Sequence, residues 1–147
     1  MEKVTLSFVS QDETFDIKMK REHALKIPFV KKALTFDGDQ NHIEINFRSC
    51  ELDVDHYHIW LKIGIISQPT RETIILADFL GDTKYVSLAS KKVDWGQYKD
   101  IKNQHPICQK YMTEWYLDQC FHTAMPESDK IVVNRYYDLY DGIITEK

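Results

Sequence analysis

The stretch Thr70–Leu80, TRETIILADFL, constrains the fold more than any other part of the chain, because it has almost no polar face. A helix that is apolar nearly all round is buried inside a domain rather than laid on its surface. Thr70 is a suitable N-cap, since its hydroxyl can accept a hydrogen bond from an N–H of the first turn. Gly81 can end the helix, because glycine enters the left-handed conformation without a Cβ clash. The sequence therefore predicts a buried helix over residues 70–80.

A second short helix is predicted directly after that glycine. Asp82 or Thr83 can cap it. Tyr85, Leu88 and Ala89 follow at three- and four-residue spacing, which places them on one face of the helix. The two helices form a hairpin that the rest of the chain must cover.

Three runs of alternating apolar and polar residues predict β-strands, because successive side chains of a strand point to opposite faces. The runs cover residues 4–9, 15–19 and 43–47. The first two are joined by the polar residues Ser10–Glu13, which is the arrangement of an antiparallel hairpin. We therefore expect a small three-stranded sheet.

Helical spacing is predicted between these strands and after them. Pro28 splits the first helical segment, since proline donates no N–H and clashes with the preceding turn. We expect two short helical pieces, at about 22–27 and 29–35. A longer helix is expected to begin with Asp53 as its N-cap and to stop at Ser67–Pro69. Its core face is expected to consist of four residues at helical spacing: Tyr57, Trp60, Leu61 and Ile65.

The C-terminal third is expected to add further helices. Pro106 suits the first turn of one of them, where its missing N–H costs little, and a last helix is expected after a break at 125–128. The complete prediction is an α+β fold: a small three-stranded sheet packed on a cluster of helices, with additional C-terminal helices. We expect residues 1–92 to form the core and residues 93–147 to form a helical extension packed on or beside it.

Five segments carry a resemblance to a known family: VTLSFVSQDETFDIKM, REHALKIPFVKKAL, HIEINF, DHYHIWLKIG and, above all, ILADFLGDTKYVSLA. Their order resembles the BTB/POZ fold, most closely its short branch of Skp1 and elongin C adaptors, over about residues 3–92. Asp78 stands where family members usually have a second small residue. The first strand starts at about residue 3, so we do not expect the N-terminal helix that many BTB proteins exchange in dimers.

The resemblance implies a protein–protein interaction adaptor rather than an enzyme. Its core would dock on a scaffold, a cullin in the case that the family suggests, and its C-terminal helices would recruit a second protein in a ubiquitin-ligase assembly. Trp and Tyr are enriched at interface hot spots. The candidate partner-binding residues are therefore aromatic residues of the tail: Trp115, Tyr116, Tyr136, Tyr137 and Tyr140. These rings could instead fill a small core under the terminal helices.

A self-assembling structural protein is the alternative. The exposed edges of a small sheet can pair between copies, which would give a closed homo-oligomer. The lean toward Ile, Lys, Asp, Asn and Tyr is typical of AT-rich genomes, which some large DNA viruses have. This alternative therefore includes a virion component or a viral mimic of a host adaptor.

One group of residues has the ligand types of a tetrahedral zinc site: His105, Cys108, Cys120 and His122. In a helix, the side chains of Cys120 and His122 would point about 200° apart. The eleven residues between Cys108 and Cys120 would separate the two pairs by about 16 Å in a continuous helix. The spacing therefore argues against zinc, and we expect no metal and no cofactor.

Composition and motifs argue against several other classes. The net charge of −4, from 19 basic and 23 acidic residues without a basic stripe, does not favour nucleic-acid binding. No stretch approaches the ~20 apolar residues that span a bilayer, and the start MEKVTLSFV does not resemble a secretory signal. Motifs such as G-x-S-x-G, the P-loop and H-E-x-x-H are absent from the sequence. We therefore expect an intracellular protein, without enzymatic activity and without nucleic-acid or membrane partners.

Overall fold

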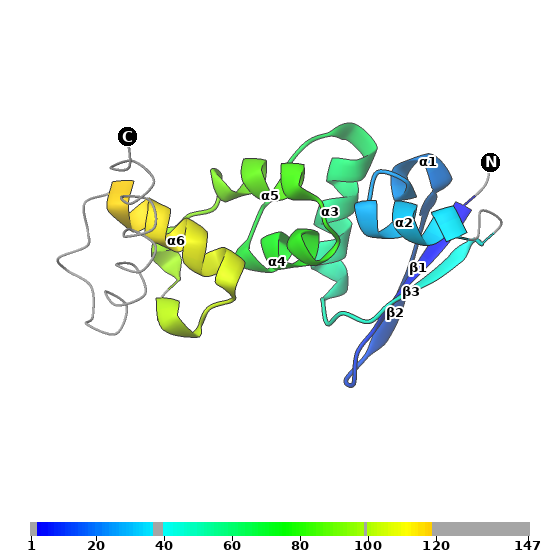
Figure 1. Cartoon of the computed structure of the whole chain (residues 1–147), viewed down its shortest axis with the longest axis horizontal. Coiled ribbons are helices and arrows are strands. Elements are labelled where there is room, and N and C mark those ends of the chain that lie inside the picture. The colour runs from blue at the N-terminus through cyan, green and yellow to red at the C-terminus, as the bar shows by residue number, and fades with distance from the viewer. Residues whose placement is uncertain (1–2, 37–39, 99, 119–147) are drawn as a thin grey trace. The chain divides into compact units, whose positions relative to one another are not determined.

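A computed structural model describes residues 3–36, 40–98 and 100–118 of the chain (Figure 1). It has an α+β fold, with a three-stranded sheet and six α-helices in the described residues, so the predicted fold class is confirmed. The chain separates into two compact units, Met1–Lys92 and Val93–Lys147, which we call unit 1 and unit 2. Each unit is described by itself below.

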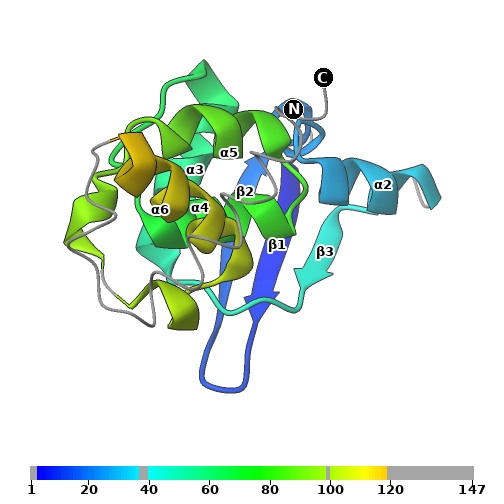
Figure 2. The same ribbon diagram turned by 60° about the vertical axis from the view of Figure 1, so that its left-hand side comes forward.

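The sheet of unit 1 consists of β1 (Lys3–Val9), β2 (Thr14–Lys20) and β3 (His42–Ile45). Figure 2 shows β1 between the other two strands, in the order β2-β1-β3. β1 pairs with β2 in antiparallel orientation, as the predicted hairpin requires, and with β3 in parallel orientation. β3 is shorter than the predicted run 43–47, because the N–H of Phe47 bonds to the carbonyl of Ile45 at 3.0 Å in a tight turn.

One face of this sheet contributes to the core. Alternate residues of all three strands are buried: Val4, Leu6, Phe8, Ile17, Met19, Ile43 and Ile45. Lys18 and Glu44, which point to the other face, are exposed. Within unit 1, helices α3, α4 and α5 lie to one side of the sheet (Figure 1). The sheet is therefore apolar toward the helices and polar on its open face, as period-two alternation requires.

The connection from β2 to β3 contains two short helices, α1 (Arg21–Ala24) and α2 (Pro28–Phe36). Pro28 begins α2, where its missing N–H leaves no backbone acceptor of the helix unpaired. Val30 and Leu34, four residues apart, are buried. The two predicted helical pieces are confirmed, with boundaries shifted by one to three residues.

Helix α3 (Glu51–Ile63) begins earlier than predicted. Its N-cap is Cys50, so the prediction that Asp53 caps the helix is wrong, and Asp53 lies in the first turn instead. In the first turn, the negative charge of its carboxylate interacts favourably with the positive end of the helix dipole and stabilises the helix. The helix also ends earlier, at Gly64, whose φ of 72° is left-handed. Ile65 is consequently outside the helix and 56% exposed, which corrects its predicted place in the core.

Helices α4 (Arg71–Phe79) and α5 (Thr83–Ser90) form the predicted hairpin. The Thr70 hydroxyl accepts from the N–H of Thr73 and the Thr73 hydroxyl accepts from the N–H of Thr70, which is a reciprocal capping arrangement. Gly81, with φ of 80°, lies between the two helices as expected. On α5, Leu88 is 38% exposed, and Val86 is buried beside Tyr85 and Ala89 in its place.

A buried carboxylate joins α3 to the start of α5. Asp82 accepts from the hydroxyl of Tyr57 at 2.7 Å and from the indole N–H of Trp60 at 3.0 Å, both at Oδ2. Its Oδ1 accepts from the N–H of Tyr85 at 3.0 Å, so the same side chain caps α5. Burial, together with the nearby Asp82 carboxylate, raises the pKa of Tyr57 above its ordinary range.

Tyr57 is therefore expected to make folding sensitive to alkaline pH. The ordinary pKa of tyrosine is 10.0, so above that pH the unfolded chain loses a proton that the folded chain retains. The free energy of unfolding then falls as pH rises, by about 1.4 kcal/mol per pH unit for one such group. Urea unfolding from pH 8 to 11 should show a shallower decline for Tyr57→Phe than for the wild type. Parallel declines would contradict this assignment.

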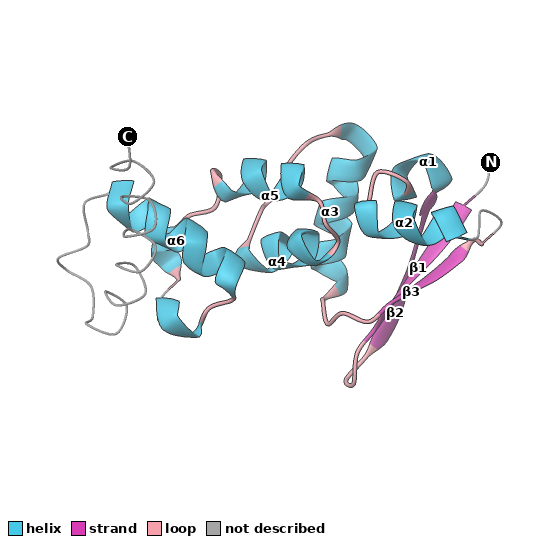
Figure 3. Ribbon diagram, viewed as in Figure 1, coloured by secondary structure: helices cyan, strands magenta, loops and turns pink. Residues whose placement is uncertain are grey.

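The described part of unit 2 contains two 3₁₀ turns, η1 (Trp95–Gln97) and η2 (Ile101–Asn103), and one longer helix, α6 (Pro106–Asp118). All strands drawn in Figure 3 belong to unit 1. The core of unit 2 includes residues from each of these elements: Trp95, Ile101, Cys108 and Met112. The predicted helix that begins at Pro106 is confirmed, and the predicted last helix, after residues 125–128, lies outside the described residues.

Gly96 leaves room for an aromatic ring of α6. A Cβ at this position would lie 2.8 Å from Cη2 of Trp115, which is closer than carbon atoms approach in proteins. We expect Gly96→Ala to displace the ring and to destabilise unit 2 by about 1–3 kcal/mol, the usual cost of overpacking. Thermal unfolding and near-ultraviolet circular dichroism measure both effects. Trp115→Phe shortens the ring and should remove most of the additional cost of Gly96→Ala, and failure of this rescue would contradict the contact.

Candidate protein-interaction surface

Helix α4 is not buried all round, which corrects the prediction with which the sequence analysis begins. One side of the helix belongs to the core: Ile74, Leu76, Ala77 and the following Leu80 are at most 1% exposed. On the other side, Ile75 is half-buried and Phe79 is 41% exposed. These two residues lie four positions apart, so they share a face. An apolar helix face therefore reaches the surface of unit 1.

Two further rings extend this face. The ring of Phe47, just after β3, stacks on that of Phe79 with the centroids 4.5 Å apart. The ring of Phe29, on α2, lies 5.7 Å from Phe79. Both are half-buried. We call this surface, formed by Phe29, Phe47, Ile75 and Phe79, the α4 face. Aromatic pairs at these separations attract one another, so these contacts fix the rings and preform the surface in the unbound protein.

A cleft of about 320 Å³ adjoins the α4 face and shares Phe47 and Ile75 with it. Three segments that are distant in the sequence form its walls. They are the hairpin tip at 12–13, the segment 47–53 that leads from the β3–α3 connection into the first turn of α3, and the first half of α4, which contributes Glu72 and Ile75. Its apolar lining residues, Phe47 and Ile75, are half-buried and form what we call its base. Its charged lining residues form what we call its edge, and four of them are exposed: Asp12, Glu13, Arg48 and Glu72.

Cys50 lies in this cleft, and its thiol is poorly suited to act as a nucleophile. The thiol donates to Oδ2 of Asp53 at 3.0 Å. Partial burial and this hydrogen bond raise the pKa of the Cys50 thiol. Because the thiolate is the reactive form, a raised pKa disfavours nucleophilic chemistry at neutral pH.

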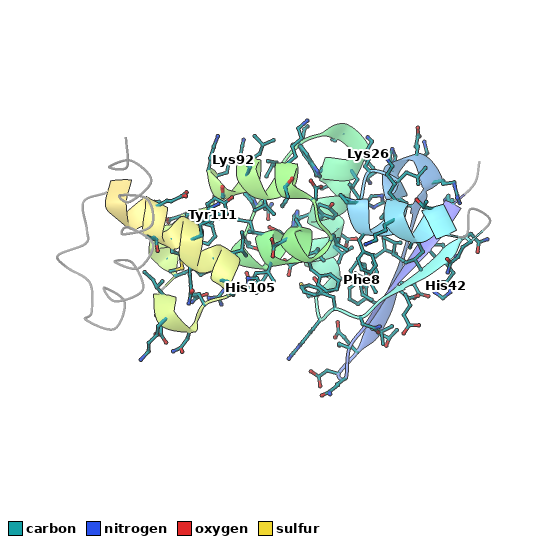
Figure 4. All side chains as sticks on the ribbon, viewed as in Figure 1. Phe8, Lys26, His42, Lys92, His105 and Tyr111 are labelled. Atoms are coloured by element: carbon teal, nitrogen blue, oxygen red, sulfur yellow. The ribbon has the colours of Figure 1, made fainter. Side chains whose placement is uncertain are left out.

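A serine, an aspartate and a histidine meet on the open face of the sheet, and the sequence analysis missed them. The Ser7 hydroxyl donates to Oδ1 of Asp16 at 2.6 Å and lies 2.6 Å from Nε2 of His42, which is labelled in Figure 4. Asp16 thus bonds to the serine, and its partner in the cluster is not the histidine. A catalytic triad requires a histidine that accepts the serine proton and an aspartate that orients the histidine. Here the aspartate bonds to the serine and does not orient the histidine, and the cluster connects the three strands.

The four residues considered and rejected as a zinc site are only partly described. His105 is exposed, and its Nδ1 accepts from the N–H of Ile107 at 3.1 Å. Cys108 is completely buried in unit 2. Cys120 and His122 lie outside the described residues. Among the residues that the structure describes, no group of three or more His, Cys, Asp or Glu side chains is arranged to hold a metal ion.

Among the predicted partner-binding aromatic residues, only Trp115 has a described side chain. It is half-buried and packs beside Gly96. The side chain of Tyr116, and the whole of Tyr136, Tyr137 and Tyr140, lie outside what the structure describes. Trp95 is buried, and its ring stacks on Tyr111, labelled in Figure 4, with the centroids 6.3 Å apart. This ring belongs to the core of unit 2 and is not one of the predicted partner-binding residues.

Comparison of the chain with protein-family models, with curated proteins and with solved structures finds no match. Within the described ranges, no helix is long and apolar enough to cross a membrane. The functional argument therefore starts from the α4 face and the cleft beside it.

Proposed function

We propose that this protein is a protein–protein interaction adaptor of the BTB/POZ type, similar to Skp1, and that unit 1 docks on a scaffold such as a cullin through the α4 face. The observation that carries the proposal is the exposed side of α4. Ile75 and Phe79 lie on the surface of a helix whose other side is in the core, and the ring of Phe47 stacks on that of Phe79. Contiguous apolar surface that includes aromatic rings is typical of interaction sites.

The order and pairing of the elements also support the proposal. A hairpin, a pair of short helices, a third strand and then three helices is the order that the BTB/POZ resemblance implies. In unit 1, β3 joins the sheet beside β1 after the two short helices. The α4–α5 hairpin follows, with α4 placed so that one side remains available to a partner.

Self-assembly is the second candidate, and the open edges of the sheet favour it. β2 and β3 are the outer strands, so each has an edge without a neighbouring strand among the described residues of unit 1. Such edges can pair with another copy. β3 has only four residues, and β2 carries the exposed lysines Lys18 and Lys20, features that commonly protect edges. We therefore place the adaptor function first and a homo-oligomeric structural role second.

The function is tested by binding of the full chain to a cullin N-terminal domain. Replacing both Ile75 and Phe79 by serine removes apolar contact area at the centre of the α4 face, so we expect affinity to fall by about tenfold or more. The matched control replaces Ile63 and Leu52 by serine. These are also exposed apolar residues, at 66% and 63%, but they are not part of the α4 face. Isothermal titration calorimetry measures the affinities.

Circular dichroism and urea unfolding of both variants show whether a loss of binding reflects a loss of fold. Equal affinities of the two folded variants for the cullin domain would remove the α4 face from the proposal. If the wild type formed no complex with the cullin domain, a cullin would no longer be the proposed scaffold.

A further inference from the structure

We propose that the cleft beside the α4 face binds a partner segment in which lysine or arginine side chains flank an apolar side chain. This inference rests on the proposed adaptor function and specifies the chemistry of the partner. It is carried by the charge at the edge of the cleft, by the apolar residues at its base, and by the ion pair that crosses its edge.

The edge of the cleft is acidic on several sides. Asp12 and Glu13 come from the hairpin tip, Asp53 from α3 and Glu72 from α4. Arg48 is the only cationic residue among the described residues that line the cleft. Just outside it, Nε of Arg71 donates to Oε1 of Glu72 at 2.7 Å, so four carboxylates are set against these two guanidinium groups. A cleft whose lining carries an excess of negative charge attracts positively charged groups. An acidic segment or a nucleic-acid phosphate would be repelled.

The base of the cleft is apolar and preformed. Phe47 and Ile75 contribute to it, and the ring of Phe47 is fixed by its stacking on Phe79. The volume of about 320 Å³ accommodates one apolar side chain together with part of the segment that carries it. A segment that is basic without an apolar residue would satisfy the edge and leave the base uncovered. Both features are therefore required of the partner.

A cationic side chain of the partner can replace Arg48 in its ion pair with Asp12. Nη2 of Arg48 lies 3.4 Å from Oδ2 of Asp12, and the two side chains are 79% and 64% exposed. Exposed ion pairs of this kind contribute little to the stability of the folded protein. These two residues, with Phe47, also line the neighbouring hollow under the hairpin tip, so the pair lies where a segment would pass from one hollow to the other. A partner cation would compete with Arg48 for Asp12.

The test uses the full chain and three blocked, fluorescein-labelled peptides of equal length, measured by fluorescence anisotropy. One peptide alternates lysine with leucine, one glutamate with leucine and one lysine with serine. We expect the lysine–leucine peptide to bind at least about tenfold more tightly than either of the others, because only it meets both requirements. Its affinity should fall as sodium chloride is raised.

Three variants separate the cleft from general charge attraction. Glu13→Gln with Glu72→Gln should weaken binding of the lysine–leucine peptide about three- to tenfold. Glu22→Gln with Glu44→Gln makes the same change in net charge at exposed residues that do not line the cleft, and should leave affinity within about twofold. Arg48→Gln should tighten binding several-fold, because it releases Asp12 and removes the competing cation.

Equal binding of the lysine–leucine and glutamate–leucine peptides, equal effects of the two glutamate variants, or weaker binding by Arg48→Gln would each overturn the inference. A second copy would be the occupant instead if sedimentation showed self-association that only Glu13→Gln with Glu72→Gln abolishes. Failure of the peptides alongside an intact complex with the cullin domain would overturn this inference and leave the adaptor function standing. Failure of both would remove the proposed function as well.

Discussion

Replacing Asp82 by alanine is expected to lower the free energy of unfolding by about 2–4 kcal/mol. The substitution removes the acceptor of three hydrogen bonds and leaves the Tyr57 hydroxyl, which is buried, without its partner. Leaving a buried donor unsatisfied costs more than the net value of the bond it made. It also removes the N-cap of α5, which alone stabilises a helix by about 1 kcal/mol.

The matched control is Asp78→Ala, which removes an aspartate that is exposed on the last turn of α4. Exposed substitutions of this kind change stability by about 0.5 kcal/mol or less. Urea unfolding followed by circular dichroism measures both variants. A similar small change for Asp82→Ala and Asp78→Ala would show that the buried carboxylate does not join α3 to α5.

The second large effect distinguishes the two sides of α4. Leu76→Ala should cost about 2–5 kcal/mol, because it removes a side chain that is completely buried and leaves a cavity. Ile75→Ala, at the neighbouring position, should cost about 1 kcal/mol or less, because the isoleucine side chain is half-buried and faces the cleft. We therefore expect Leu76→Ala to lower the free energy of unfolding, and Ile75→Ala to lower the affinity for the lysine–leucine peptide.

Urea unfolding gives the stabilities of the two variants, and anisotropy with the lysine–leucine peptide gives their affinities. If Ile75→Ala destabilised the protein as much as Leu76→Ala, α4 would be buried on both sides, and the α4 face would not be available to a partner.

Features that depend on local pattern were predictable from the sequence. The alternation in β1 and β2, the cap at Thr70 and the glycine after α4 each depend on residues within a few positions of one another. The hairpins of strands and of helices follow from them. The boundaries of α3 were not predictable in the same way, because a cysteine N-cap without a side-chain bond and an early left-handed glycine leave a weak signal.

Features that depend on long-range contacts were not predictable. The meeting of Ser7, Asp16 and His42 needs the register of three strands, although the directly opposed pair Ser7 and Asp16 follows once the hairpin register is known. The side chains that donate to Asp82, those of Tyr57 and Trp60, lie 25 and 22 residues away, whereas its role as the cap of α5 is local and was predicted. Composition indicates that α4 is apolar, but only the arrangement of the other elements decides which of its sides they cover.

The candidate interaction site illustrates the same limit. The sequence predicts partner binding by aromatic residues of the tail, and only Trp115 among them has a described side chain. The α4 face and the cleft combine Phe47 with residues from the hairpin tip, α2 and α4. None of these residues has a distinctive motif, so their common surface is visible only in the fold.

The most direct test of the adaptor proposal is the solution mass of the full chain by light scattering, alone and mixed with a cullin N-terminal domain. The proposal predicts a monomer that forms a one-to-one complex, and loss of that complex when Ile75 and Phe79 are both replaced by serine. A stable homo-oligomer whose mass does not change when the cullin domain is added would contradict the proposal and favour self-assembly.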